Sequence, residues 1–165
     1  MILIGLGANL PSAEFGGPPA SLEAALAMLQ QSGVAVVRRS RWFRTAPVPA
    51  SDQPWFVNGV AAVETALDPA ALLALMQAIE ARFGRVRRER NAARVLDLDL
   101  LDYEGRVSQA GDPPPILPHP RLAERAFVLR PLAEVAPRWR HPSTGAAIPE
   151  LLAEMPPGQT AEPLS

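Results

Sequence analysis

Residues 96–100 read LDLDL, and this strict alternation of leucine and aspartate is the feature that most constrains the fold. A period-two alternation of apolar and polar residues is typical of a β-strand with one buried face. The leucines are therefore expected to face a core, whereas Asp97 and Asp99 are expected to project together from the opposite face. Along the strand, these two side chains would start roughly 6.5–7 Å apart.

An arginine-rich segment directly precedes this strand. The arginines within residues 82–94 are Arg82, Arg85, Arg87, Arg88, Arg90 and Arg94, and only Glu89 opposes them. Two neighbouring carboxylates repel each other unless a cation lies between them. Mg²⁺ commonly binds one or two carboxylates and leaves its other positions to water and phosphate, while guanidinium groups bind phosphate oxygens in a planar fork. The two segments together predict a site for a metal ion and a polyphosphate.

Each of the two segments has an ordinary explanation when it is taken alone. Two aspartates on an edge strand often serve only to prevent pairing with another strand. A run of arginines is often a solvated loop. It is their contiguity, with the carboxylates on an apolar strand, that favours the polyphosphate site.

Length and composition restrict the remaining possibilities. A chain of 165 residues is long enough for one domain with a substantial core. We expect a single catalytic domain over residues 1–155 and a disordered tail over residues 156–165. The formal net charge of −1 provides no global positive field for nucleic acid. Lysine is absent, so a phosphate-binding loop of the GxxxxGK[ST] type is excluded and any phosphate must be bound by arginine.

Cysteine is also absent, which excludes disulfides and thiolate metal sites. The sequence has no recognisable signal peptide and no apolar run as long as a membrane span. We therefore expect a cytoplasmic protein that has no membrane or nucleic-acid partner.

The order of the expected elements predicts the fold class. Strands are expected at residues 2–8, 34–44, 55–67 and 96–103. Helices are expected from a cap at Ser21 to Gly33, from a cap at Asp68 to Gly84, over 121–135, and weakly over 148–155. This β-α-β-β-α-β order predicts an α+β, ferredoxin-like sandwich with helices on one face of an antiparallel sheet, followed by a C-terminal helical arm.

Three polar or small positions stand out within these elements, and each has two interpretations. Gly7, in the first strand, allows a ligand or a packed helix to approach closely. Asn58, in an apolar strand, can read the edge of a heterocycle or make a cross-strand hydrogen bond. His119, held between two prolines, can serve as a donor or acid beside a phosphate, or it can be a surface residue of a turn.

Four motifs carry a resemblance to a known family. The segments IGLGANL, RTAPV…DQPWFVNGV, IEARFGRVRRERNAARVLDLDLL and LPHPRLAERAFVLRPL occur in this order between residues 2 and 137. They resemble 6-hydroxymethyl-7,8-dihydropterin pyrophosphokinase (HPPK) of folate biosynthesis. The resemblance implies transfer of a diphosphate from ATP to the hydroxymethyl oxygen of the pterin, with release of AMP, two Mg²⁺ ions and a monomeric enzyme.

The resemblance also implies roles for individual residues. Asp97 and Asp99 resemble the metal-binding aspartates of the family, and Asp97 also contacts the substrate. The catalytic residues it implies are Arg85, Arg94 and His119. The ATP-binding residues are Gln77, Glu80, Arg87, Arg88, Leu100, His119 and Arg125. The pterin-binding residues are Gly7, Thr45, Ala46, Val48, Phe56, Asn58 and Phe127, with the two phenylalanines stacking on the ring.

The chain departs from the family pattern in two places. The arginine loop is about one residue shorter and has Asn91-Ala92-Ala93 where Trp and Gly-Pro often stand, and Pro114 and Ile116 replace polar residues.

Three rival functions also remain. An RNA-binding module would need exposed aromatic residues, whereas aromatic residues make up only 5% of the chain. A metal-dependent phosphohydrolase would release ADP and phosphate, and a non-catalytic paralogue would lack some of the charged residues named above.

Overall fold

The computed structural model describes residues 1–47, 49–84 and 94–164 of the chain. Its elements, in chain order, are β1 (Ile2–Ala8), α1 (Pro18–Gln31), β2 (Ala35–Arg39), β3 (Phe43–Thr45), β4 (Phe56–Glu64), α2 (Pro69–Arg82), β5 (Asp97–Tyr103), a 3₁₀ turn η1 (Leu122–Glu124), α3 (Ala126–Val135), α4 (Ile148–Ala153) and β6 (Ala161–Pro163).

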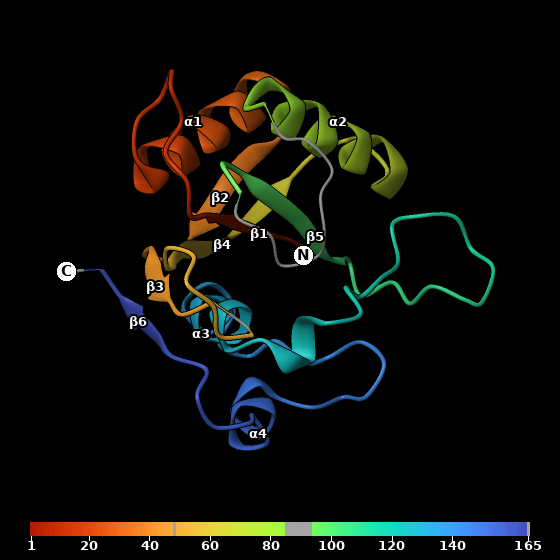
Figure 1. Ribbon diagram of the computed structural model, residues 1–165. Helices are drawn as coiled ribbons and strands as arrows, with labels where there is room; N and C mark the ends of the chain where they lie inside the picture. The colour runs from red at the N-terminus through yellow and green to blue at the C-terminus, as the bar shows by residue number, and fades with distance from the viewer. Residues whose placement is uncertain (48, 85–93, 165) are drawn as a thin grey trace.

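The strands form one antiparallel sheet in the order β5-β1-β4-β3-β6, in which β2 also pairs with β4. The α+β, ferredoxin-like arrangement predicted from the sequence is confirmed. Helices α1 and α2 cover one face of the sheet, α3 covers the other, and α4 packs on α3 (Figure 1). The helical arm predicted at the C-terminus is therefore a third layer, and it supplies the second core.

Alternation along β1 assigns its side chains to these two cores. Ile2, Ile4 and Leu6 pack against α1 and α2, whereas Leu3 packs against α3 and α4. Gly5 and Gly7 lie on the same face of β1 as Leu3, so the central strand has no side chains of its own on the α3 side at these two positions. The side chains of Asn58 and Leu101 come close to the backbone there.

Helix α2 begins as predicted, because the Asp68 side chain accepts a hydrogen bond from the Ala71 N–H at 2.8 Å and Pro69 occupies the first turn. Helix α1 does not begin at the expected cap. It starts at Pro18, and Ser21 is completely buried inside the first turn. The Gly-Pro-Pro sequence was therefore the start signal, because proline is tolerated where helix N–H groups have no partner.

The single strand expected over residues 34–44 is interrupted, and the structure corrects this prediction. Arg39 pairs with Ala61 and Phe43 pairs with Asn58. The four residue steps from Arg39 to Phe43 therefore lie opposite only three steps of β4, which interrupts the ladder. Within the interruption, the Ser40 hydroxyl accepts a hydrogen bond from the Val60 N–H at 3.0 Å. This side-chain contact replaces a backbone contact of the ladder and allows β2 and β3 to follow separate courses.

The C-terminal tail also differs from the expected disorder. Residues 161–163 form β6, which extends the sheet edge at β3, and Arg44 and Glu162 lie 3.3 Å apart on the paired strands. Backbone hydrogen bonds between strands can form whether the residues are polar or apolar, so the polar composition of the tail did not predict β6.

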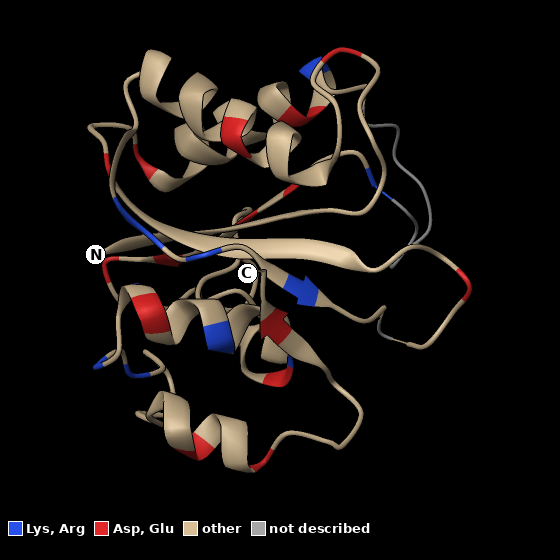
Figure 2. Cartoon of the chain, turned by 90° about the vertical axis from the view of Figure 1, so that its left-hand side faces the viewer, with Lys and Arg blue, Asp and Glu red and all other residues tan. Residues whose placement is uncertain are grey.

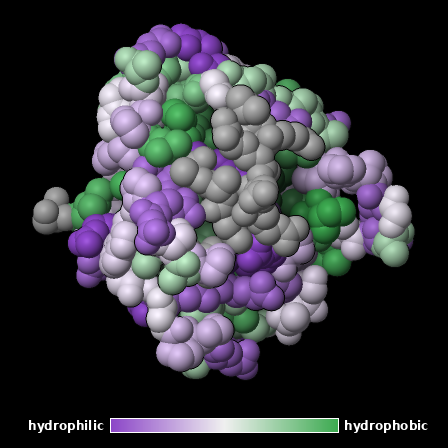
Figure 3. Space-filling model, in the orientation of Figure 1, coloured by the Kyte–Doolittle hydropathy of each residue, from purple (hydrophilic) through white to green (hydrophobic). Residues whose placement is uncertain are grey.

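The surface carries charges of both signs. Acidic and basic segments are interspersed over the helices and connections (Figure 2). The surface over α3 and α4 is largely hydrophilic on the side seen in Figure 3. Within the described ranges, every helix is too short or too polar to cross a membrane.

Candidate active site

A row of three residues crosses the middle of the sheet on its α3 side. Gly7 of β1 pairs with Asn58 of β4 on one side and with Asp97 of β5 on the other. Directly paired residues of neighbouring antiparallel strands point to the same face, and strands are about 4.8 Å apart. An amide and a carboxylate therefore flank a bare glycine, about 10 Å from each other across two strand spacings.

The next row places Asp99 beside Gly5. The recess over the two rows has a volume of about 20 Å³ and is lined by residues of β1, β4, β5 and α3, namely Gly5, Leu6, Gly7, Asn58, Gly59, Asp97, Asp99, Phe127 and Val128. The prediction that Asp97 and Asp99 share one face is confirmed by this register. The two aspartates point to the opposite face of β5 from Leu98 and Leu100, which are buried against α1 and α2.

Gly7 and Asn58 are in such close contact that no larger residue fits in place of the glycine. A Cβ atom added to Gly7 would lie far inside the van der Waals distance of the Asn58 side-chain oxygen. The Asn58 side chain is held from its other end, where its Nδ2 donates to the Thr45 hydroxyl at 2.6 Å. The amide is therefore fixed before any ligand arrives, with its edge oriented along the recess.

Positively charged side chains surround the two aspartates. A guanidinium nitrogen of Arg94 lies 4.0 Å from Asp97 Oδ1, and one of Arg125 lies 3.8 Å from Asp99 Oδ2. The side chains of Arg94 and Arg125 are only 13% and 16% exposed, so their attraction to an anion is weakly screened. The arrangement provides carboxylates for a cation and guanidinium groups for the anion that accompanies it.

His119 is held at the edge of the same site. Its backbone N–H donates to the Leu101 carbonyl at 2.9 Å, which ties the proline-rich segment to β5. Its Nδ1 accepts a hydrogen bond from the Arg121 N–H at 3.2 Å, and its Nε2 lies 3.8 Å from Asp99 Oδ1. Burial, followed by the positive charge of Arg125, lowers the pKa of His119 to about 4. The imidazole is therefore neutral at pH 7, and its Nε2–H is available as a hydrogen-bond donor to a ligand.

Phe127 and Phe56 both lie on the α3 side of the sheet. Phe127 follows the first residue of α3, and the guanidinium of Arg125 lies 5.2 Å from the centre of its ring. Phe56 opens β4 and pairs with Thr45, and both phenylalanines are partly exposed. Ala46 follows β3 next to Thr45, so the residues proposed for the pterin come from both sides of the recess.

Three of the residues expected to bind ATP lie elsewhere. Gln77 is exposed on α2, and Leu100 is buried in the core beneath α1 and α2. Glu80 is 6% exposed, and its carboxylate accepts a hydrogen bond from the Leu98 N–H at 2.8 Å. The structure thus brings Asp97, Asp99, Arg94, His119 and Arg125 together, but it leaves Gln77, Glu80 and Leu100 on the α2 side of β5. Val48, Arg85, Arg87 and Arg88 lie outside the described residues.

Asn9 was missed by the sequence analysis. Its side chain is 3% exposed, and its Oδ1 accepts from the Arg94 N–H at 2.7 Å. Its Nδ2 donates to the Gln53 side chain at 2.9 Å and to the Pro54 carbonyl at 3.0 Å. The signal in the sequence was a polar residue at the end of an apolar strand, because such a residue needs partners from other segments when it is buried.

The chain as a whole matches the family model described as 7,8-dihydro-6-hydroxymethylpterin-pyrophosphokinase (HPPK) over residues 3–137. Relatives called 2-amino-4-hydroxy-6-hydroxymethyldihydropteridine pyrophosphokinase include one from Methylorubrum extorquens, 43% identical over 93% of this chain and 92% of the relative. Another, from Pseudomonas aeruginosa, is 41% identical over 94% of this chain and 91% of the relative. A third, from Bacillus subtilis, is 38% identical over 87% and 82%.

Among solved structures, the wild-type HPPK-DHPS of Plasmodium falciparum with SDX-DHP matches with a TM-score of 0.67 and 12% identity. The alignment covers 93% of this chain but only 44% of that longer chain, so it supports the fold alone. The family model and the relatives cover most of the chain, including the segments that carry the aspartates, His119 and Arg125. The chain therefore belongs to the 7,8-dihydro-6-hydroxymethylpterin-pyrophosphokinase family.

Proposed function

We propose that the α3 side of the sheet, around Gly7, Asn58, Asp97, Asp99 and Phe127, is the active site at which this chain carries out the reaction of its family. In that reaction a diphosphate passes from ATP to the hydroxymethyl group of 6-hydroxymethyl-7,8-dihydropterin. The observation that carries the proposal is the row Asp97–Gly7–Asn58. It joins a carboxylate suited to a metal–phosphate group to an amide suited to a heterocycle, across a glycine that lets the Asn58 side chain lie close against the central strand.

The reaction requires one bond to form and one to break. The hydroxymethyl oxygen attacks the β-phosphorus of ATP, and the bond from that phosphorus to the oxygen bridging the α- and β-phosphates breaks. AMP leaves with the bridging oxygen, and the hydroxyl proton passes to solvent. Negative charge builds up on the oxygens around the β-phosphorus and on the departing α-phosphate, so cationic groups fixed near them lower the barrier.

The donor set of the site fits magnesium. Asp97 and Asp99 offer carboxylate oxygens on one face, and Mg²⁺ commonly takes one or two carboxylates together with substrate phosphates. We infer that two Mg²⁺ ions bind with ATP at these residues, where they would neutralise phosphate charge. Arg94 lies 4.0 Å from Asp97 and Arg125 lies 3.8 Å from Asp99, so each carboxylate already has a positive charge beside it.

The phosphate chain would be held by side chains that already converge on the aspartates. Arg94 and Arg125 supply fixed guanidinium groups, and His119 supplies a neutral Nε2–H donor. A neutral donor suits this position, because a metal ion bound at Asp99 would repel an imidazolium cation. Gln77, Glu80 and Leu100 stay predictions for the nucleotide, as do Arg85, Arg87 and Arg88 outside the described residues.

The pterin would bind on the α3 side of the sheet beside Asn58 and Phe127, where the recess of about 20 Å³ would have to widen, because that volume holds only about one water molecule. The Asn58 amide would pair with the edge of the ring, and Phe56 and Phe127 would stack on its faces, which contributes about 0.5–1.5 kcal/mol per aromatic pair beyond burial. The backbone at Thr45, Ala46 and Val48 would provide the remaining polar contacts. All these residues belong to one chain and, as proposed, one catalytic domain, so a monomer suffices.

The test is a product assay with ATP, Mg²⁺ and 6-hydroxymethyl-7,8-dihydropterin. AMP formed in equal amount to the diphosphorylated pterin supports the proposal. Formation of ADP and phosphate would instead indicate a phosphohydrolase. AMP that appears only when the pterin is present separates transfer from slow hydrolysis of ATP.

A further inference from the structure

Residues 159–164, here called the C-terminal brace, are hydrogen-bonded to both sides of the proposed pterin site. One end of the brace contacts the turn that carries Arg125 and Phe127, and the other pairs with the strand that carries Thr45. No family motif recognised in the sequence reaches this segment, since the motifs end near residue 137.

Gln159 contacts the backbone on each side of Arg125. Its Oε1 accepts a hydrogen bond from the Ala126 N–H at 2.9 Å, and its Nε2 donates to the Glu124 carbonyl at 2.9 Å. Helix α3 starts at Ala126 and has no side-chain cap of its own. One amide from the tail thus satisfies an N–H of the first helical turn and fixes the extended backbone of Arg125.

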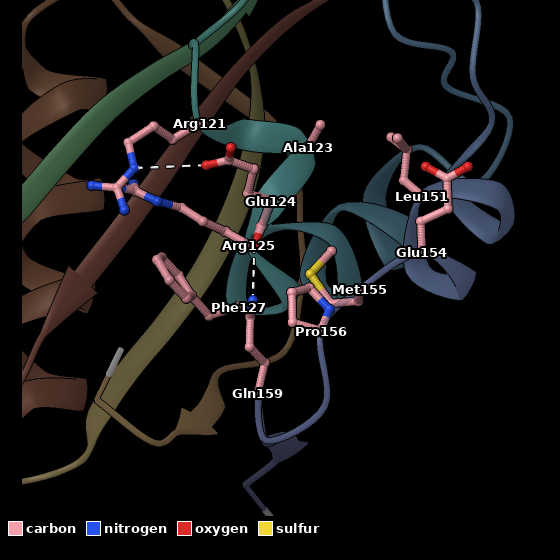
Figure 4. A pocket seen from close by; sticks show the side chains of 10 residues that line it. All are labelled: Arg121, Ala123, Glu124, Arg125, Phe127, Leu151, Glu154, Met155, Pro156 and Gln159. Atoms are coloured by element: carbon pink, nitrogen blue, oxygen red, sulfur yellow. Dashed lines mark hydrogen bonds and ion pairs between the residues drawn. The ribbon is translucent and has the colours of Figure 1, made fainter. Parts of the chain in front are cut away.

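The space behind this turn is open. A cavity of about 530 Å³ lies between the η1–α3 turn and the end of α4, and Gln159 reaches across its rim to the turn (Figure 4). A segment that is backed by a cavity has fewer packing contacts to hold it in place. On the cavity side, the two hydrogen bonds from Gln159 hold the backbone of this turn, in addition to the packing of buried Leu122 and Ala126 in the core.

The remainder of the brace holds the opposite side of the site. Ala161 of β6 pairs with Thr45 of β3, and the Ala46 N–H donates to the Thr160 carbonyl at 3.3 Å. The Thr45 hydroxyl in turn accepts the hydrogen bond that orients the Asn58 amide, at 2.6 Å. The same short segment therefore connects the residue that stacks on the pterin to the residue that reads its edge.

We propose that the C-terminal brace sets the spacing between Phe127 and Asn58, and that Gln159 is a positioning residue for pterin binding. This inference rests on the proposed location of the pterin site. Gln159 touches neither ligand in this scheme; it acts through the backbone of Arg125 and Ala126. Binding geometry is sensitive to displacements of about 1 Å, so a loosened brace is expected to weaken pterin binding before it abolishes the chemistry.

The experiment uses the full-length chain with Gln159→Leu, which removes both hydrogen bonds at similar volume. The matched control is Gln30→Leu, an exposed glutamine of α1 on the other face of the sheet. We expect Gln159→Leu to raise the KM and Kd for the pterin roughly tenfold, with kcat lowered less than twofold and with the Gln30→Leu protein unchanged. A purely structural role would lower the melting temperature and the fraction of active protein but leave the pterin Kd of the folded protein unchanged.

Gln159→Glu keeps the test decisive if the leucine protein does not fold. The glutamate retains an acceptor for the Ala126 N–H and loses the donor to Glu124, so an intermediate rise in pterin KM is expected. Wild-type pterin affinity in both folded variants, or an equal effect in Gln30→Leu, would overturn the inference. A wild-type chain that forms no AMP would refute the proposed function instead, so the two failures are distinguishable.

Discussion

His119 Nε2 lies 3.8 Å from Asp99 Oδ1, while Nδ1 of the same ring accepts a hydrogen bond from the backbone of Arg121. The second contact fixes the tautomer, because an Nδ1 that accepts carries no proton. The proton of the neutral ring is therefore on Nε2 and faces the carboxylate. A histidine held in this way offers a hydrogen-bond donor to a ligand at pH 7 without adding charge to the site.

This arrangement predicts a pH dependence of folding for the metal-free protein. Burial holds the pKa of His119 at about 4 in the folded chain, compared with about 6.5 in an unfolded chain. Between pH 6.5 and 4 the unfolded state binds the proton and the folded state does not, so stability falls as the pH falls. Above pH 6.5 His119 is neutral in both states and the free energy of unfolding is not lowered by its titration. Below that pH, protonation of His119 in the unfolded chain lowers the free energy of unfolding by at most about 3 kcal/mol. Urea unfolding with EDTA at pH 7.5, 6 and 5 measures it.

His119→Gln is the control for this effect, because glutamine keeps a donor and does not titrate. The free energy of unfolding of the wild type minus that of His119→Gln should fall as the pH is lowered from 7.5 to 5, because only the wild type carries this titrating group. Parallel curves over that range would show that His119 is not protected from protonation.

Asp97→Asn and Asp99→Asn are each expected to reduce the rate of AMP formation by about a thousandfold or more, since a neutral amide cannot balance a bound cation. Both side chains are about one-third exposed, so the fold should be preserved. Steady-state kinetics and far-UV circular dichroism check the two claims. Asp112→Asn, on an exposed loop, serves as the control, and near-wild-type turnover in either site variant would contradict the metal assignment.

Gly7→Ala should abolish pterin binding and destabilise the sheet, because the new methyl group collides with the Asn58 amide, which is anchored on Thr45. Overpacking of this kind costs about 1–3 kcal/mol. Gly5→Ala provides a close comparison. Its Cβ would meet Leu101 at 3.5 Å, an ordinary contact, so its destabilisation should be clearly smaller. Thermal unfolding and pterin titration distinguish the two, and equal effects would argue against a specific role for the Gly7–Asn58 contact.

Asn9→Ala should destabilise the fold by about 2–3 kcal/mol, because three partly buried hydrogen bonds are lost. It should also raise the KM for ATP, since the Arg94 N–H loses its acceptor and the Arg94 backbone is then held only through its carbonyl, by the N–H groups of residues 9 and 10. Asn9→Asp separates the two effects. It keeps the acceptor for the Arg94 N–H but loses the donors to Gln53 and Pro54, so ATP binding should suffer less than stability. Unchanged ATP affinity in Asn9→Ala would show that Asn9 is not needed to position Arg94 for ATP binding.

Several parts of the fold and site could be predicted from local sequence. The alternation around Asp97 and Asp99 set the face on which both project, and the Asp68-Pro69 pair set the start of α2. The motif segments also identified the family and brought His119 and Arg125 into consideration. The first two inferences depended on side-chain periodicity and backbone preference within a few residues, which the sequence carries directly, whereas the family and the roles of His119 and Arg125 came from the resemblance of the motifs.

The sequence by itself determined which residues alternate, where α2 starts and which chemistry two aspartates beside an arginine run can support. Only the tertiary structure decided that Gly7 lies between Asn58 and Asp97, that Asn9 holds Arg94 and that the C-terminal tail pairs with β3. The physical reason is that these contacts join residues far apart in the chain. Their formation depends on strand register and on the satisfaction of buried polar groups, and no local pattern specifies either.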